Sequence, residues 1–109
     1  MPRGSHLGEF EYLIMLALLR LRGDAYGMRV RREIQSRTDR SVTIGSVYAT
    51  MDRLEKKGYA LSAADKDDAG RARKYFRVTR DGAEAMRRHL EAMEGMTEGL
   101  TLRHELDSV

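Results

Sequence analysis

The 109-residue sequence contains no cysteine, no tryptophan and only one proline. Without cysteine the chain forms neither disulfide bonds nor thiolate metal sites, which fits a reducing compartment and predicts a cytoplasmic protein. The longest apolar run, Tyr12–Leu19, has eight residues, whereas a membrane-spanning helix needs about 20. A secretory signal would need a basic stretch before such a run and a small-residue cleavage site after it. We therefore expect neither a membrane span nor a secreted protein.

Catalytic motifs are missing as well. The sequence has no cysteine nucleophile, no G-x-S-x-G elbow and no glycine-rich phosphate loop. His89-Leu90-Glu91 imitates the H-x-E motif of zinc deaminases, but the cysteine ligands of those enzymes are absent. The three histidines, His6, His89 and His104, lack the spacing of metal ligands. We therefore expect no enzymatic activity, no metal and no cofactor.

The net charge of +3 is unevenly distributed along the chain. Residues 1–82 carry 17 Lys and Arg against 11 Asp and Glu, whereas residues 83–109 carry 3 against 6. A basic body with an acidic tail favours a polyanion such as nucleic acid as the partner of the body. A solvated surface with uneven charge is the simpler alternative. The stretch Pro2–His6 fits a native basic arm or the remnant of a cleavable tag, and no function is inferred from it.

Three helices are predicted in the first half of the chain. The first, Gly8–Leu21, is apolar on every face at its centre, so we expect a second copy of the chain to cover part of it. The second is predicted from Asp24, as N-cap, to Arg37. The third, Ile44–Lys57, is predicted to be capped by Thr43 and ended by Gly58.

After the third helix the hydrophobic period changes from that of a helix to that of a strand. Tyr59–Ala64 and Arg73–Val78 are predicted strands, joined by a polar turn at Gly70. A final helix is predicted from Asp81, with Thr79 as its cap. Its apolar residues keep heptad spacing, which is typical of a helix that packs on another helix.

This order of elements predicts a mainly α, α+β fold with a winged helix-turn-helix. We assign residues 7–80 to the DNA-binding domain and residues 81–109 to a C-terminal dimerisation helix and tail. The predicted dimerisation residues are Tyr12, Met15, Met86, Leu90, Met93 and Leu100. The methionines among them also suit a small hydrophobic effector, with plain packing as the alternative.

The third helix has the profile of a helix that enters the major groove. One face is apolar, and the other combines small polar side chains, which let the backbone approach base edges, with cations for phosphates or guanine. The hairpin adds a basic tip that suits DNA backbone or minor groove. The predicted DNA contacts are Thr43, Ser46, Ala49, Thr50, Arg53 and Lys57 on the helix and its cap, and Arg71, Arg73 and Lys74 on the hairpin. An ordinary amphipathic helix with a solvated face is the alternative.

Several segments resemble the PadR family of bacterial transcriptional regulators. They are Leu7–Glu11, Ala25–Gly27, the long block Gly45–Gly58, and Arg71–Thr79. Members often have proline where this chain has Ala49, a difference that does not threaten the helix, because alanine is the better helix former.

The resemblance implies a homodimeric repressor whose C-terminal helix crosses the first helix of the partner, as in the short subfamily with one dimerisation helix. It also implies that Tyr26 and Tyr48 contact the DNA backbone. We therefore expect a sequence-specific regulator that binds an inverted-repeat operator and is relieved by a small effector. A protein-interaction module with the same fold and no specific DNA contact is the alternative, and the basic residues on the third helix and hairpin favour DNA.

Overall fold

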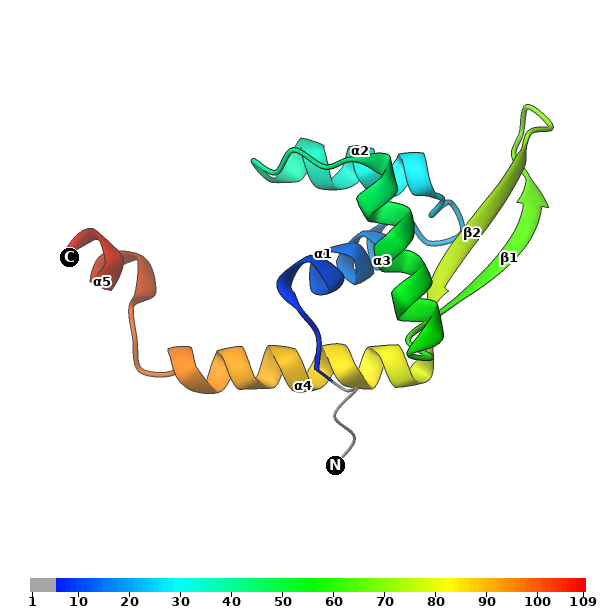
Figure 1. Cartoon of the computed structure of the whole chain (residues 1–109). Coiled ribbons are helices and arrows are strands. Elements are labelled where there is room, and N and C mark those ends of the chain that lie inside the picture. The colour runs from blue at the N-terminus through cyan, green and yellow to red at the C-terminus, as the bar shows by residue number, and fades with distance from the viewer. Residues whose placement is uncertain (1–5) are drawn as a thin grey trace.

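The computed structural model describes residues 6–109, so Pro2–Ser5 of the N-terminal basic stretch lie outside the described residues. The elements follow in the order α1 (Glu9–Arg20), α2 (Gly27–Arg37), α3 (Ile44–Lys56), β1 (Ala60–Lys66), β2 (Ala72–Val78), α4 (Arg80–Thr97) and α5 (Leu102–Asp107). Figure 1 shows α1, α2 and α3 gathered into a body with the hairpin at its side. Helix α4 passes along the body and projects beyond it, carrying α5. The predicted mainly helical winged architecture is confirmed.

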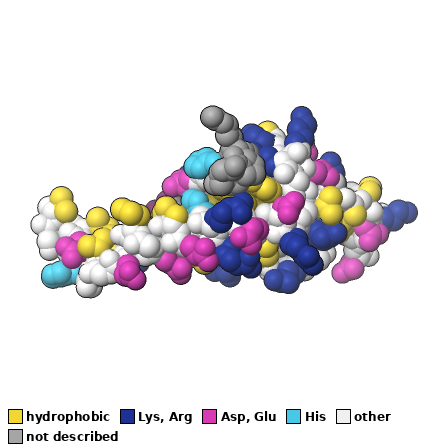
Figure 2. Space-filling view, turned by 90° about the horizontal axis from the view of Figure 1, so that it is seen from below, with side chains coloured by type: hydrophobic (Ala, Val, Ile, Leu, Met, Phe, Trp, Pro, Cys, Tyr) yellow, Lys and Arg dark blue, Asp and Glu magenta, His cyan; other side chains and the backbone are white. Residues whose placement is uncertain are grey.

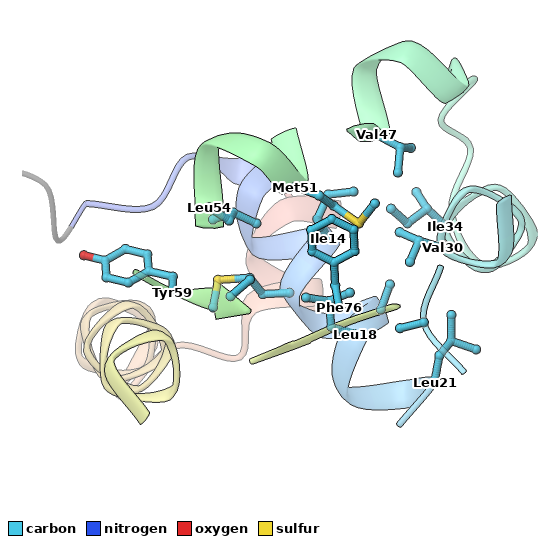
Figure 3. Close-up of a cluster of buried hydrophobic side chains, with 14 of the residues drawn as sticks. Ile14, Leu18, Leu21, Val30, Ile34, Val47, Met51, Leu54, Tyr59 and Phe76 are labelled. Atoms are coloured by element: carbon cyan, nitrogen blue, oxygen red, sulfur yellow. The ribbon is translucent and has the colours of Figure 1, made fainter. Parts of the chain in front are cut away.

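A single apolar core joins the three helices of the body to the hairpin (Figure 3). Ile14 of α1, Val30 of α2, and Met51 and Leu54 of α3 are all 0% exposed. Phe76 brings β2 into the same cluster at 3% exposure. Each such side chain contributes about 1.5–3 kcal/mol when it is fully buried, so the core fixes the orientation of α3 on the body.

The predicted start of α3 and both of its predicted caps are confirmed, although the helix ends at Lys56, one residue before the predicted end. The Thr43 side chain accepts a hydrogen bond from the Ser46 amide at 3.1 Å, which satisfies one free N–H of the first turn. Such a cap contributes about 1 kcal/mol. Beyond the last turn Gly58 adopts φ +82°, a left-handed conformation that favours glycine.

The start of α2 differs from the prediction: the helix begins at Gly27, with Tyr26 as N-cap, and not at Asp24. The reason is a long-range contact with β2. The carbonyl of Ala25 accepts a hydrogen bond from the Phe76 amide at 2.9 Å, and Tyr26 forms an isolated antiparallel bridge with Tyr75. This segment is therefore extended and pairs with the hairpin.

The hairpin is an antiparallel pair in which Ala60 lies opposite Val78 and Lys66 opposite Ala72. Strand β1 continues to Lys66, beyond the predicted end at Ala64, because backbone pairing continues to that point. Asp67 organises the turn. Its carboxylate accepts hydrogen bonds from the Ala69 amide at 3.0 Å, the Arg71 amide at 2.8 Å and Arg73 Nε at 3.1 Å. The backbone hydrogen bond from Arg71 is the main cause that lowers the pKa of Asp67.

Helix α4 begins at Arg80, one residue before the predicted Asp81, and its predicted cap is confirmed, since the Thr79 hydroxyl accepts a hydrogen bond from the Gly82 amide at 3.0 Å. The predicted heptad seam from Ala83 to Leu100 does not lie on one helix. The helix stops at Thr97, Gly99 adopts φ +84°, and Leu100 lies outside it in the link to α5. Helix α5 was not predicted. Within residues 6–109 no helix is long and apolar enough to cross a membrane.

Candidate nucleic-acid interface

The outward face of α3 lies opposite its core stripe. Because successive helical residues are about 100° apart, the inward positions Val47, Met51 and Leu54 place another set of side chains on the solvent side. The exposed residues of α3 are Gly45, Tyr48, Ala49, Asp52, Arg53 and Lys56. This face offers a small residue at its centre and polar or aromatic groups around it.

The outward orientation predicted for Thr50 is wrong. Thr50 is only 3% exposed, because it lies about 70° from the centre of the core stripe, on the flank that faces α1. Its hydroxyl accepts a hydrogen bond from Arg53 Nη2 at 3.4 Å. Lys56, which the sequence reasoning missed, is exposed. The signal was present, since Lys56 follows Ala49 by seven residues on the same side of the helix.

Arg53 and Lys57 are both held by a buried carboxylate of α1. Glu11, 6% exposed, accepts hydrogen bonds from Arg53 Nε at 3.1 Å and from Lys57 Nζ at 2.9 and 3.1 Å. It also accepts one from the Gly8 amide at 2.9 Å. Burial by itself raises the pKa of Glu11, but the hydrogen bonds from Gly8, Lys57 and Arg53 outweigh it, and the pKa lies below its ordinary value.

Tyr48 lies over the first residue of α2. The side chain is 41% exposed, and a Cβ atom added to Gly27 would lie 2.4 Å from Tyr48 Cζ and 2.6 Å from its hydroxyl oxygen. Glycine at position 27 thus makes room for the phenol. The arrangement places the Tyr48 hydroxyl at the junction of α2 and α3.

Tyr26 belongs to an aromatic cluster beside the middle of the hairpin, where Tyr75 pairs with Ala63. Its ring meets the Tyr75 ring edge-on with centroids 5.7 Å apart, and Arg73 Cζ lies 4.3 Å from the Tyr26 centroid. Partial burial raises the pKa of Tyr75. Arg73, whose side chain is 24% exposed, also pairs with Asp67 at 3.1 Å. Arg73 is therefore a structural cation of the hairpin rather than a free one.

Two other basic residues of the hairpin, Lys74 and Arg71, differ in whether a carboxylate lies close to them. Lys74 Nζ lies 3.9 Å from both Asp52 Oδ1 and Glu55 Oε1, which connects the hairpin to α3. Arg71 is exposed, and among residues 6–109 its side chain has no carboxylate partner, as is also true of Lys56. In Figure 2 the Lys and Arg side chains gather over the body, whereas the projecting arm shows mostly hydrophobic and acidic ones.

The predicted dimerisation residues fall into two groups. Met15 is 0% exposed and Met86 is 7% exposed, so both pack inside the protomer, and the prediction that Met15 is free to meet a partner is wrong. Leu90 of α4 is 47% exposed, Met93 is 50% exposed, and Leu100 beyond the helix is 50% exposed.

A groove of about 310 Å³ runs between α1 and α4 beside these exposed side chains. Its lining includes Tyr12, Leu16 and Leu19 of α1 and Met86 and Leu90 of α4. The Tyr12 ring stacks on His89 of α4 with centroids 4.4 Å apart. In the described part of the chain no group of three or more His, Cys, Asp or Glu side chains is arranged to hold a metal ion.

Comparison with known proteins gives one consistent result. The family model described as "Transcriptional regulator PadR-like family" matches residues 15–88. A PadR family transcriptional regulator from Eggerthella lenta is 27% identical with a TM-score of 0.66, over 89% of this chain and 87% of that chain. A PadR-like transcription factor from Bacteroides fragilis shares the fold, at 23% identity and a TM-score of 0.69, over 87% of each chain.

One curated sequence relative has no described function. It is an uncharacterized protein of Lysinibacillus sphaericus, 41% identical over 69 residues. The match spans 61% of this chain and 62% of that protein, which is less than two thirds of the relative's length.

Proposed function

The chain belongs to the PadR-like family of transcriptional regulators, and we propose that it is a homodimeric repressor that binds an inverted-repeat DNA operator. Proteins of this family are not enzymes; they bind DNA, usually as dimers. The observation that carries the proposal is the outward face of α3, where Ala49 and Tyr48 are exposed while Val47 and Met51 anchor the helix in the core.

We assign base contact to the first half of α3, because its small residues let the helix backbone approach base edges. Thr43, Ser46 and Ala49 lie there, although the Ser46 hydroxyl also donates to the Thr43 carbonyl at 2.8 Å. Tyr48 and Tyr26 would contact the backbone, and contacts of that kind fix the register of the protein on the duplex.

The cations around this helix would provide the sequence-independent attraction to DNA phosphates. Lys56 on α3 and Arg71 at the hairpin are exposed and unpaired within residues 6–109, which makes them the best candidates for phosphate contact. Arg53, Lys57, Arg73 and Lys74 each have at least one carboxylate within 4.0 Å. The predicted DNA contacts of Arg73 and Lys74 are therefore assigned to the rim of the interface, whereas Arg53 and Lys57 are held by Glu11.

The dimer would be formed by α4, so that residues 7–80 bind DNA and residues 81–109 hold the dimerisation helix. Leu90 and Met93 are half exposed on α4, and Leu16 and Leu19 are exposed on α1 at 36% and 37%. Apolar side chains that one protomer leaves in water are typical of an interface. Burying such groups against a second copy offsets the entropy that association costs.

A small hydrophobic effector would act in the groove between α1 and α4. Tyr12 and Met86 line it, and it continues to Leu90 at the proposed dimer interface. An effector there would release DNA only if it binds the DNA-free arrangement of the two protomers more tightly than the bound one. Aromatic compounds that release operator in a gel shift, with Leu90→Ala reducing their potency, would support this site.

The experiment that tests the function is a footprint and a salt titration on inverted-repeat duplexes selected from a random pool. Two protected half-sites about 10 bp apart are expected, since one α3 per protomer enters successive major grooves. Six to eight phosphate contacts would give a slope of log K against log salt of about −5 to −7. Protection of one half-site, or an affinity indifferent to salt, would contradict the proposal and favour the protein-interaction alternative.

A further inference from the structure

The carboxylate of Glu11 is buried on a helix whose neighbouring positions are apolar. Its residue is 6% exposed, while Ile14 and Met15 of the same helix are 0% exposed. A buried charge is costly unless it is paired and hydrogen-bonded. Capping the first turn of α1 needs only the hydrogen bond to the Gly8 amide. The two additional cations are Arg53 of α3 and Lys57 at its C-cap, so the carboxylate does more than cap its own helix.

The pairing fixes how Arg53 leaves α3. Its Nε donates to Glu11 and its Nη2 to Thr50 Oγ1, so one edge of the guanidinium faces the body of the protein. Lys57 is more completely engaged: its Nζ lies within 3.3 Å of both Glu11 oxygens and of the His6 carbonyl, and its side chain is 26% exposed. Arg53, whose side chain is 53% exposed, keeps the other edge of its guanidinium in solvent but is held in place by these two hydrogen bonds.

The pairing also changes the charge beside the candidate interface. Glu11 neutralises one of the two positive charges that α3 gains from Arg53 and Lys57. Sequence-independent affinity for duplex DNA rises with each phosphate that a cation neutralises, whereas specificity depends on the ratio between operator and random DNA. A carboxylate that restrains two cations therefore lowers binding to random DNA more than binding to an operator read by the first half of α3.

We propose that Glu11 is a positioning residue for specificity: it holds Arg53 and Lys57 against α1, so that α3 discriminates DNA sequences by its first two turns. This inference rests on the proposed DNA-binding function. The exposed residues Tyr48 and Ala49 lie in those two turns, and Arg53 and Lys57 follow them.

The test compares Glu11→Gln with the parent on an operator duplex and a random duplex across a salt series. Glu11→Gln releases Arg53, whereas Lys57 Nζ keeps its hydrogen bond to the His6 carbonyl. The released Arg53 adds about one phosphate contact and steepens the slope by about 0.9, which is up to about eightfold in affinity per tenfold change in salt. Random DNA should gain most of this, so the ratio of operator to random affinity should fall. A variant that merely loses folded protein would weaken binding to both duplexes alike.

Glu33→Gln is the matched control. Glu33 also pairs with two cations, Arg20 at 2.9 Å and Arg37 at 2.5 Å, but these lie on α1 and α2 rather than on α3. The Glu33→Gln variant removes the same charge as Glu11→Gln and should leave the ratio of operator to random affinity unchanged. The double variant Glu11→Gln/Arg53→Gln should bring the slope back toward that of the parent, because the released cation is removed.

If Glu11→Gln does not fold, the single variant Arg53→Gln still tests whether Arg53 contacts DNA in the parent. With Arg53 restrained, its loss should leave the salt slope of the parent unchanged. A loss of about 0.9 in that slope, or equal ratios for Glu11→Gln and Glu33→Gln, would overturn the assignment of Glu11. A parent protein that shows neither operator preference nor salt dependence would instead contradict the proposed function, so the two failures are distinguishable.

Discussion

Replacing Gly82 by alanine would place a methyl group where α4 touches the backbone of the body. A Cβ atom at this position would lie 2.2 Å from the Tyr59 carbonyl oxygen and 2.9 Å from Met15 Cε. The methionine can rotate away, but the carbonyl cannot, because it also accepts a hydrogen bond from the Thr79 amide at 3.1 Å. To reach an ordinary contact of 3.4 Å, α4 would have to retreat by about 1.2 Å.

Such overpacking costs about 1–3 kcal/mol, and the loss of close contact around the buried Ala85 and Met86 adds to it. We therefore expect Gly82→Ala to lower stability by about 2–3 kcal/mol, which for a domain of this size lowers Tm by about 10–20 °C. Thermal unfolding followed by circular dichroism measures the effect at a fixed protein concentration.

Gly95→Ala is the control within the same helix. A Cβ atom there has nothing within 4 Å, and alanine in a helix interior is favoured over glycine by about 0.5–1 kcal/mol. This variant should be as stable as the parent or slightly more so. If Gly82→Ala unfolded at the same temperature as Gly95→Ala, the close docking of α4 on Tyr59 would be refuted.

Three further predictions concern the interface, the buried carboxylate and the dimer. Gly27→Ala should displace the Tyr48 phenol and weaken operator and random duplexes alike by about fivefold, the loss of one hydrogen bond of about 1 kcal/mol; unchanged binding in a fluorescence anisotropy titration would contradict the position of Tyr48. The pKa of Glu11 lies below its ordinary value of 4.5, so its charge stabilises the fold above pH 4.5 and this stability is lost as pH falls through the lowered pKa. The Tm gap between the parent and Glu11→Gln should therefore narrow in acid, and a gap that is constant with pH would refute the ion pairing. Leu90→Asp should give monomers in sedimentation velocity because it puts an unpaired charge into the proposed interface, whereas Leu61→Asp, equally exposed at 46% against 47% but on the hairpin, should not.

The parts of the fold that depend on residues close together in the sequence were predictable from the sequence. The cap by Thr43, the left-handed Gly58 and the core stripe of α3 follow from local rules of helix formation. The start of α2 was missed because it depends on a contact between Tyr26 and Tyr75, which are far apart in the sequence. Because this pairing keeps the segment extended, Asp24 does not cap the helix.

The helix and hairpin that form the candidate site were predictable, but the pairing of their cations with carboxylates was not. Thr50 was misplaced although the phase of the helix was readable from Val47 and Met51. The restraint of Arg53 could not be predicted, because Glu11 lies 42 residues earlier in the chain. Charge counts identify a basic helix, but they do not show which cations are already paired.

Ala49→Glu tests directly whether the outward face of α3 reads DNA. Ala49 is exposed at the centre of that face, so the longer side chain enters solvent and Tm should change by less than about 2 °C, in keeping with the small effect of surface substitutions. A carboxylate there would meet base edges and phosphates, and like charges brought together across an interface cost several kcal/mol. In fluorescence anisotropy on the selected inverted repeat, we expect at least about a 100-fold loss of affinity for this folded variant, in line with that cost. Affinity within about twofold of the parent would contradict a DNA-reading role for α3 and place the DNA contact elsewhere on the molecule.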